Sequence, residues 1–156
     1  MNKDKYPGYD ALNPFFELME TALSADVDGE HFFDYFSDDL VYEFPFPLPG
    51  SPTRYDGPES LKQQFAGFGD VLWLDSMSDL VVHRSQEPGG VTVLILEYAS
   101  HGKSVITNNP YNNRYVSIVR IRNRKIFNWR DHCDQMVVLN AVGGLEPVIA
   151  QLKAGQ

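Results

Sequence analysis

Residues 111–144, YNNRYVSIVRIRNRKIFNWRDHCDQMVVLNAVGG, decide the fold of this chain. Apolar and polar residues alternate over residues 115–121 and again over residues 126–131, and the polar triplet Arg122-Asn123-Arg124 separates the two runs. Two such runs around a short polar break predict a β-hairpin. Residues 136–141 then predict a short helix, which the pair Gly143-Gly144 ends.

Asp131 closes the second run among aromatic residues. A carboxyl that a strand carries into an aromatic interior has a raised pKa and can carry a proton. Alternation along the strand predicts three companions on the same side: Phe127, Trp129 and Cys133. Two other roles fit the same residue, namely pairing with Arg130 or capping the next helix, although Asp134 is better placed as the cap.

Upstream of the hairpin, the sequence predicts helices first and long strands afterwards. Asn13-Pro14 is typical of a helix start, with Asn13 as the cap and Pro14 at the first position. The predicted segments are a flexible lead-in over 1–9, helices over 14–23, 29–36, 57–68 and 146–153, strands over 40–46, 75–84 and 91–101, and an irregular loop over 46–55. This order indicates a single α+β domain over residues 1–156, with helices on one face of a curved antiparallel sheet.

The charge is unevenly spread. The formal net charge is −8, which argues against a general nucleic-acid binder, and 16 of the 21 acidic residues lie within residues 1–80. Arg120, Arg122 and Arg124 are spaced two apart, so on one strand they would share a face. That face could bind RNA, or it could be an outer sheet face that is solvated or paired with acids; the charge balance favours the second interpretation.

Composition also sets expectations for location and cofactors. Cys133 is the only cysteine, so we expect no intramolecular disulfide and a reducing, cytoplasmic location. The start, MNKDKYPGYD, does not resemble a signal peptide, and no apolar run approaches the roughly 20 residues that span a bilayer, so we expect no membrane partner. Neither a phosphate-binding glycine loop nor a metal-binding motif is present, and the four histidines are far apart; we expect no cofactor and no metal.

Aromatic residues make up 13% of the chain, which suits either a small-molecule pocket or a Phe-rich core without one. The candidate ligand-binding residues are Tyr42, Phe44, Trp73, Tyr98, Tyr115, Ser117 and Trp129. The tyrosines among them fit an amphipathic core equally well. The sequence leaves open which face of the strand 91–101 lines a pocket, the one with Glu97 or the one with Tyr98.

Two further features concern surfaces. The last strands have two apolar faces, and helices can cover only one of them, which predicts a homodimer. The proline-rich segment 46–55 predicts a rigid rim at a pocket entrance, with Phe46 and Leu48 as its apolar surface. Packing of these two side chains against the helix over 57–68 is the alternative.

Four segments in this order resemble the nuclear-transport-factor-2-like superfamily, in its SnoaL-like, ketosteroid-isomerase-like branch. They are DYFSDDLVYEFP (34–45), YDGPESLKQQF (55–65), NRYVSIVRIRNRKIFNWRDHCDQ (113–135) and VLNAVGG (138–144). The resemblance implies a single SnoaL-like domain with a cystatin-like, cone-shaped α+β barrel, in which three N-terminal helices pack on a strongly curved antiparallel sheet around a pocket. It also implies a homodimer formed through the outer face of the sheet.

The resemblance carries over to function only at some positions. In SnoaL-like polyketide cyclases an acid of the last strand does the acid–base work, and Asp131 stands at that position, whereas Ser117 stands where those cyclases have a histidine. Phe16, Phe44 and Ser117 stand near the catalytic positions of steroid isomerases. SHGK (100–103) and NNRY (112–115) are similar to PhzA/PhzB-type phenazine-biosynthesis proteins, whose pocket histidine falls near Gln64.

Together these features predict a cofactor-independent protein with a pocket for an apolar or ring-bearing small molecule. Asp131 would move a proton next to a carbonyl of that molecule, as an isomerase or cyclase does, and hydroxyls of Tyr42, Tyr98, Tyr115 and Ser117 would stabilise the oxyanion. The alternative is a non-catalytic ligand-binding or dimerisation module of the same fold.

Overall fold

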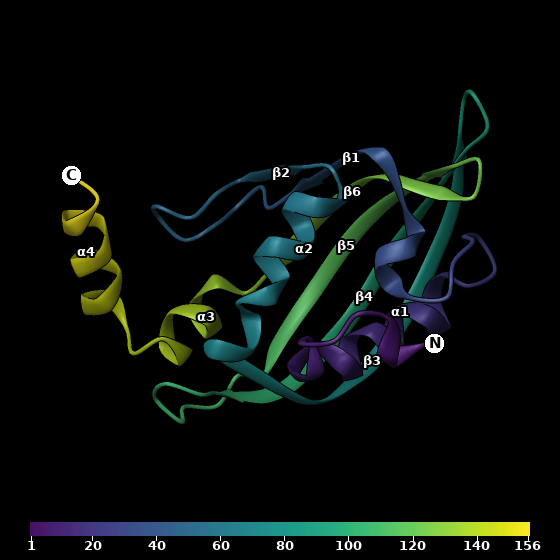
Figure 1. Cartoon of the computed structure of the whole chain (residues 1–156). Coiled ribbons are helices and arrows are strands. Elements are labelled where there is room, and N and C mark those ends of the chain that lie inside the picture. The colour runs from purple at the N-terminus through teal and green to yellow at the C-terminus, as the bar shows by residue number, and fades with distance from the viewer.

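Six strands form one sheet, and helices α1 and α2 lie on the same side of it (Figure 1). The computed structural model describes all 156 residues. The strands are β1 Phe36–Glu43, β2 Arg54–Asp56, β3 Leu72–Glu87, β4 Val91–Ser104, β5 Asn113–Arg122 and β6 Lys125–Cys133, in the spatial order β2-β1-β6-β5-β4-β3. The α-helices are α1 Asn13–Leu23, α2 Pro58–Ala66, α3 Gln135–Ala141 and α4 Leu145–Ala154, and the 3-10 helices are η1 Lys3–Lys5, η2 Asp10–Leu12, η3 Phe32–Tyr35 and η4 Phe68–Asp70.

The sheet is mixed, which corrects the expectation of an antiparallel sheet. β1 runs parallel to β6, with Tyr42 opposite Trp129 and Glu43 opposite Arg130, while the other strand pairs are antiparallel. The predicted α+β class is confirmed. Alternation along a strand indicates which of its residues share a face, but it does not indicate the direction of the strand that pairs with it. The sequence therefore did not predict that β1 and β6 are parallel.

The predicted hairpin is confirmed, and its turn is tight. Asn123 and Arg124 have φ values of 51° and 59° and connect β5 to β6. Positive φ at both central residues is what a two-residue hairpin turn requires, because it matches the twist of the flanking strands. The Arg124 guanidinium donates to Asp28 Oδ1 at 2.6 Å and to the carbonyl of Val27 at 3.0 Å, which holds the turn against the segment after α1.

An irregularity at Phe127 changes which residues of β6 face inward. Ile121 pairs with Ile126, whereas Arg120 pairs with Asn128, so Phe127 is an extra residue of β6 in this ladder. A β-bulge of this kind shifts the alternation by one residue. Ile126 is therefore fully buried, while Phe127 lines a hollow on the other face of the sheet; its predicted place beside Asp131 is wrong.

The core lies between the helices and the inner face of the sheet. α1 buries Phe15, Phe16, Met19, Ala22 and Leu23, as its spacing predicts. Pro14 lies in the first turn, but Asn13 is part of the helix and the residue before it is Leu12, so the predicted Asn13 cap is wrong. The chain enters α1 directly from the 3-10 helix η2, which leaves no extended residue to act as a cap.

The predicted helix over 29–36 is one turn of 3-10 helix, η3, followed at Phe36 by β1. His31 caps it: the ring Nδ1 accepts from the backbone N–H of Phe33 at 3.2 Å, and Asp34 accepts from the backbone N–H of His31 at 3.0 Å. Phe32 and Phe33 are buried, as predicted. Residues 1–9, expected to be a lead-in, lie against this region, where the Tyr6 hydroxyl donates to Asp34 at 2.8 Å.

The C-terminal helices stand at one end of the sheet, with α4 furthest from it (Figure 1). Asp134 caps α3 by accepting from the backbone N–H of Met136 at 2.9 Å, as predicted. Leu145, Ile149 and Leu152 of α4 keep large exposed surfaces. No single helix has the length and apolarity to cross a membrane; α3 and α4 taken together do on composition, but they are bent by 85°.

The arginines of the hairpin are largely paired with acids of the same chain. Arg120 binds Glu87, Arg122 lies 3.6 Å from Asp39, and Arg124 binds Asp28. This pairing accords with the interpretation of an outer, self-neutralised face. Arg124 lies in the turn, so the three side chains do not share one strand face.

Candidate active site

Asp131, Ser117 and Tyr98, hereafter the Asp131 cluster, meet on the inner face of the sheet. Ser117 of β5 lies directly opposite Asp131 of β6, and Tyr98 comes from β4 on the other side of β5. Ser117 Oγ donates to Asp131 Oδ1 at 2.6 Å, and the Tyr98 hydroxyl lies 2.7 Å from Ser117 Oγ and 3.4 Å from Asp131 Oδ1. The two short distances describe a relay in which Tyr98 donates to Ser117 and Ser117 donates to the carboxylate.

The surroundings of Asp131 favour its neutral form. Burial raises the pKa of the Asp131 carboxyl to about 6, and the hydrogen bonds from Ser117 and Tyr98, together with the nearby indole N–H of Trp129, oppose that rise because they stabilise the anion. The residue keeps partial solvent access. A carboxyl with a pKa close to neutrality can both accept and return a proton, as a general acid–base catalyst must.

Trp129 and Tyr42 form the aromatic wall beside the cluster. Both are buried, and their rings stack at 5.6 Å with an angle of 8° across the parallel pair of β6 and β1. The indole N–H of Trp129 influences Asp131 by lowering its pKa, yet no acceptor lies within hydrogen-bonding geometry of this buried nitrogen. Buried polar groups almost always have partners, so a buried N–H without an acceptor beside Asp131 is unusual.

A tyrosine network continues from the cluster along β4 and β5. The Tyr98 ring stacks on Tyr115 at 5.0 Å, and the Tyr115 hydroxyl lies 2.7 Å from that of Tyr111 and 3.2 Å from Ser100 Oγ. Burial raises the pKa of all three tyrosines, so they are protonated donors at neutral pH. The sequence-based selection missed Tyr111, although counting alternate residues back from Tyr115 through Asn113 leads to it.

Burial shows which face of β4 points inward. Leu96, Tyr98 and Ser100 are on the inner face, whereas Glu97 is about half exposed and lies 2.6 Å from His83 of β3. Cys133, on the same side as Asp131, is a protonated thiol because burial, assisted by the Asp131 charge, raises its pKa to about 12. Its protonated state disfavours nucleophilic chemistry at this position.

The structure brings most of the predicted site residues together. Phe44 joins through Tyr42, with ring centroids 5.2 Å apart. Trp73 does not join: it is 42% exposed and lines a separate hollow with Lys103 and Val105. Aromatic neighbours that the sequence did not single out are Phe15, 6.2 Å from Tyr98, and Phe65, 6.0 Å from Tyr42; both come from the helices that cover the sheet.

The two alternative roles of Asp131 find no support in its contacts. Arg130 points to the other face of β6, and the helix cap is Asp134. No three His, Cys, Asp or Glu side chains gather as metal ligands would. Two surface hollows have volumes of about 520 and 460 Å³, and neither includes Asp131, so an enclosed cavity at the Asp131 cluster stays a prediction.

The proline-rich loop lies beside the C-terminal end of β6. Phe46 is 71% exposed, and its ring centroid lies 5.8 Å from that of His132, one residue beyond Asp131. Gly50, at φ 83°, faces Leu152 of α4. Phe46 therefore does not pack into the core, and its role as an entrance rim stays a prediction.

The fold defines the class of protein: the chain has the nuclear-transport-factor-2-like fold, as the resemblance implied. No family model matches the chain. The uncharacterized protein YesE of Bacillus subtilis strain 168 is 28% identical over 138 residues, covering 85% of this chain and 92% of YesE. An uncharacterized PhzA/B-like protein of Pseudomonas aeruginosa is 27% identical over 124 residues, covering 80% of this chain and 85% of that protein.

Solved structures agree with this class. A candidate isomerase from Bacillus subtilis superposes with a TM-score of 0.69 at 25% identity, covering 92% of this chain and 97% of that one. A candidate polyketide cyclase from Xanthomonas campestris gives 0.59 at 15% identity over 85% and 94% of the two chains. A protein with a ketosteroid isomerase-like fold from Catenulispora acidiphila, in complex with trimethylamine, gives 0.52 at 18% identity over 81% and 92%.

Proposed function

We propose that this chain is a cofactor-independent enzyme that moves a proton next to a carbonyl of an apolar or cyclic small molecule, as isomerases and cyclases do. The observation that carries the proposal is the inner-face carboxyl of Asp131, which has a pKa of about 6 and a hydroxyl relay from Tyr98 through Ser117. The similarity to a candidate isomerase at 25% identity supports the same chemistry.

In the proposed reaction, the Asp131 carboxylate removes a proton from the carbon next to the substrate carbonyl. The electron pair of the broken C–H bond forms the C=C bond of an enolate, and the carbonyl oxygen takes the negative charge. Asp131, now protonated, returns the proton to a different carbon for isomerisation. For cyclisation, the enolate carbon instead attacks a second carbonyl of the same molecule, and the oxygen of that carbonyl becomes an alkoxide that takes the proton back from Asp131.

The developing oxyanion needs donors that are not already engaged. Ser117 and Tyr98 are occupied with each other and with the carboxylate. The indole N–H of Trp129 is buried and has no acceptor. The Tyr42 ring stacks on the Trp129 ring, and its hydroxyl is protonated because burial raises its pKa. We assign these two groups as the oxyanion donors, because fixed donors in a dry site stabilise charge that develops during reaction.

A proton-exchange assay tests the proposal without knowledge of the natural substrate. A panel of cyclic and aryl ketones in D₂O is followed by NMR for deuterium at the carbon next to the carbonyl. We expect wild-type protein to accelerate exchange for some member of the panel. The exchange rate with Asp131→Asn should be lower than the wild-type rate by a factor of about 10² to 10⁴.

Glu97→Gln is the matched control, because Glu97 is an exposed carboxylate on the outer face. It should leave the exchange rate unchanged. The rate should rise as pH increases through about 6, when Asp131 becomes the base form. Equal exchange by wild-type and Asp131→Asn protein would falsify the catalytic assignment.

A non-catalytic ligand-binding role is the second candidate. It is favoured by the position of the two hollows, neither of which includes Asp131. A ketone that binds with measurable affinity, while no member of the panel exchanges, would identify this role.

We also propose that the chain forms a homodimer through the outer face of the sheet. Val81 and Val116 pair with Glu97 from the two neighbouring strands, and they are 47% and 40% exposed on that face. Exposed apolar patches of this kind are uncommon on monomers. Light scattering should give twice the chain mass of 17.7 kDa, and a monomer at micromolar concentration would exclude the dimer.

A further inference from the structure

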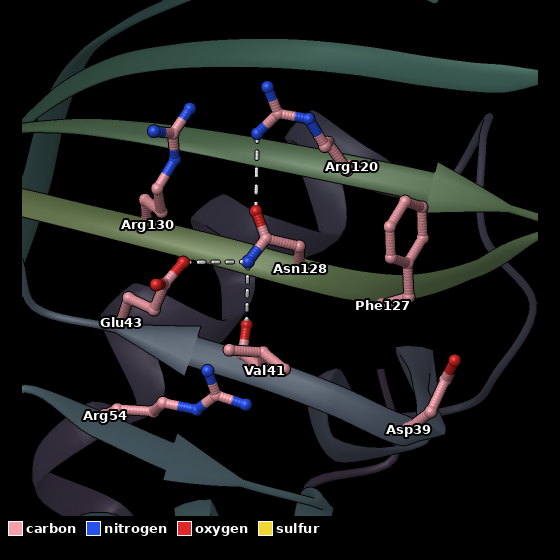
Figure 2. Close-up of a pocket in the computed structure, with 8 residues that line it drawn as sticks. All are labelled: Asp39, Val41, Glu43, Arg54, Arg120, Phe127, Asn128 and Arg130. Atoms are coloured by element: carbon pink, nitrogen blue, oxygen red, sulfur yellow. Dashed lines mark hydrogen bonds between the residues drawn. The ribbon is translucent and has the colours of Figure 1, made fainter. Parts of the chain in front are cut away.

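The hollow of about 520 Å³ is bordered by Asn128 and Arg130 of β6 (Figure 2). Arg130 and Asp131 are consecutive residues of this strand, so the hollow lies on the face opposite Asp131. β1, β2, β5 and β6 form it with the following side chains: Asp39, Val41, Glu43, Arg54, Arg120, Phe127, Asn128 and Arg130. Its volume is within the range of small-molecule sites, on the order of 300–1,000 Å³. The chemistry assigned to Asp131 does not use any of these residues.

Arg130 is the exceptional residue of this hollow. Its Nε is buried and has no hydrogen-bond partner, and its guanidinium forms no ion pair. Glu43 is its direct neighbour on β1, but the Glu43 carboxylate accepts instead from Asn128 Nδ2 at 3.0 Å. A buried N–H without an acceptor is costly, which indicates that a hydrogen-bond acceptor is the missing partner of this Nε.

The other two arginines are held in place by acids of the chain. Arg120 binds both Glu87 carboxylate oxygens through Nε, at 3.1 and 3.3 Å, and Arg54 donates from Nε to Asp56 Oδ1 at 2.8 Å. Arg120 Nη1 also donates to Asn128 Oδ1 at 3.3 Å. These contacts fix two positive groups at the border of the hollow, so an anion there would meet a preformed site.

The acids around the hollow balance its arginines in number. Asp39 lies 3.6 Å from Arg122, while Arg54 and Arg120 bind Asp56 and Glu87. Glu43 and Arg130 lie opposite each other on β1 and β6 but form no ion pair, and the Glu43 carboxylate accepts from Asn128 instead. Arg130 is therefore the arginine of the hollow that has no acid bound to it.

The apolar part of the hollow is a consequence of the bulge in β6. The bulge turns Phe127 outward, where its ring lies against the Arg122 guanidinium at 4.5 Å, and Val41 adds an aliphatic surface. A ligand in this hollow would therefore meet an aromatic ring and an arginine within one small space.

We propose that this hollow binds the carboxylate of a small organic acid, with the carboxylate on Arg130 and an apolar or ring-bearing portion on Phe127 and Val41. Arginine matches a planar carboxylate through two parallel N–H donors, which favours a carboxylate over a spherical anion. The site is separate from the Asp131 cluster because the two lie on opposite faces of β6.

Benzoate is the probe for this site, with neutral benzamide and inorganic phosphate for comparison. Calorimetric titration should show that benzoate binds to the wild-type protein more tightly than either comparison compound. Arg130→Gln should weaken benzoate binding by about tenfold or more, and Arg130→Lys should restore only part of it, because a lysine keeps the charge but not the two parallel donors.

Arg114→Gln is the matched control, since Arg114 is an exposed arginine of β5 that does not line the hollow. It should bind benzoate as wild-type protein does, and so should Asp131→Asn. Because Arg130→Gln could disturb folding, the Arg130 Nε–H resonance of the wild-type protein provides a second measurement, and it should shift on benzoate addition.

Three results would overturn the proposal. The first is benzoate binding that Arg130→Gln leaves unchanged. The second is phosphate binding as tight as benzoate and insensitive to Phe127→Ala, which indicates a simple ion site. The third is loss of benzoate binding in Asp131→Asn, which places the acid at the Asp131 cluster; the proposed proton transfer does not depend on any of these outcomes.

Discussion

The two faces of β6 place opposite charges in opposite environments. On the inner face, Asp131 lies among buried aromatic rings and is held by hydroxyls, and burial raises its pKa to about 6. On the outer face, one residue earlier, Arg130 borders a hollow whose two other arginines, Arg54 and Arg120, already form ion pairs with acids of the chain. The difference shows that alternation along one strand can supply two unrelated sites, and that burial decides which chemistry each site supports.

The largest effect expected from this comparison is on stability. Trp129→Ala removes a fully buried ring and should lower the free energy of unfolding by about 3–5 kcal/mol. Phe127→Ala, two residues away on the same strand, should have a clearly smaller effect because that ring is only partly buried on the outer face. Urea denaturation of both variants measures the contrast, and equal losses would contradict the assignment of the two faces.

The next effect is the pH dependence caused by Asp131. Its pKa is about 6 in the folded chain and about 3.9 when unfolded, so the folded state binds the proton more tightly. The stabilising contribution is full below about pH 4 and is lost as pH rises through about 6. Linkage sets its upper limit at about 3 kcal/mol, and partial solvent access makes it smaller.

Asp131→Asn lacks this titration. The stability of wild-type protein relative to Asp131→Asn should therefore fall between about pH 4 and pH 6, as denaturant midpoints at a series of pH values would show. A difference that stays constant across this window would mean that the carboxyl is solvated in the folded chain.

A smaller effect concerns the hydroxyl relay. Ser117→Ala removes the 2.6 Å bond to Asp131, a bond that stabilises the anion, so the pKa of Asp131 should rise above about 6. Carbon-13 NMR titration of the carboxyl group measures it. Ser100→Ala is the control, because Ser100 bonds to Tyr115 and not to Asp131; if both variants shift the pKa alike, the relay is not the cause.

The smallest effect is expected from an ion pair on the outer face. His83 and Glu97 lie 2.6 Å apart, with both side chains about half exposed. At concentrations at which the chain is monomeric, Glu97→Gln should change the free energy of unfolding by less than about 1 kcal/mol, because water and salt screen exposed pairs. At higher concentrations the loss in thermal denaturation should be larger, because the partner of the proposed dimer covers this face.

Several elements of the site were predictable from the sequence because their signals are local. The alternation from Tyr115 to Ile121 places Tyr115 and Ser117 on one side of β5, and their burial in the structure shows that this side is the inner face. Asp131 was predicted to point inward with a raised pKa, and Asp134 to be the better helix cap; both predictions are confirmed. The alternation of faces along a strand and a side-chain helix cap depend on residues only a few positions apart, so both can be recognised in the sequence.

Other features depended on contacts between distant segments. The parallel pairing of β1 with β6 brings Tyr42 onto Trp129, and the bulge at Phe127 turns that residue away from Asp131 and into the outer hollow. Trp73 lies in a different hollow from the other candidates. None of these placements has a local signal, because strand direction and register are set by packing between segments far apart in the chain.

The sequence by itself therefore determined the α+β class, the hairpin and the inward carboxyl of Asp131. Only the tertiary structure decided which aromatic rings surround that carboxyl and that Arg130 on the opposite face has no partner. The physical reason is that a residue's face follows from its neighbours in the chain, whereas its burial and its partners follow from which distant strands pack beside it.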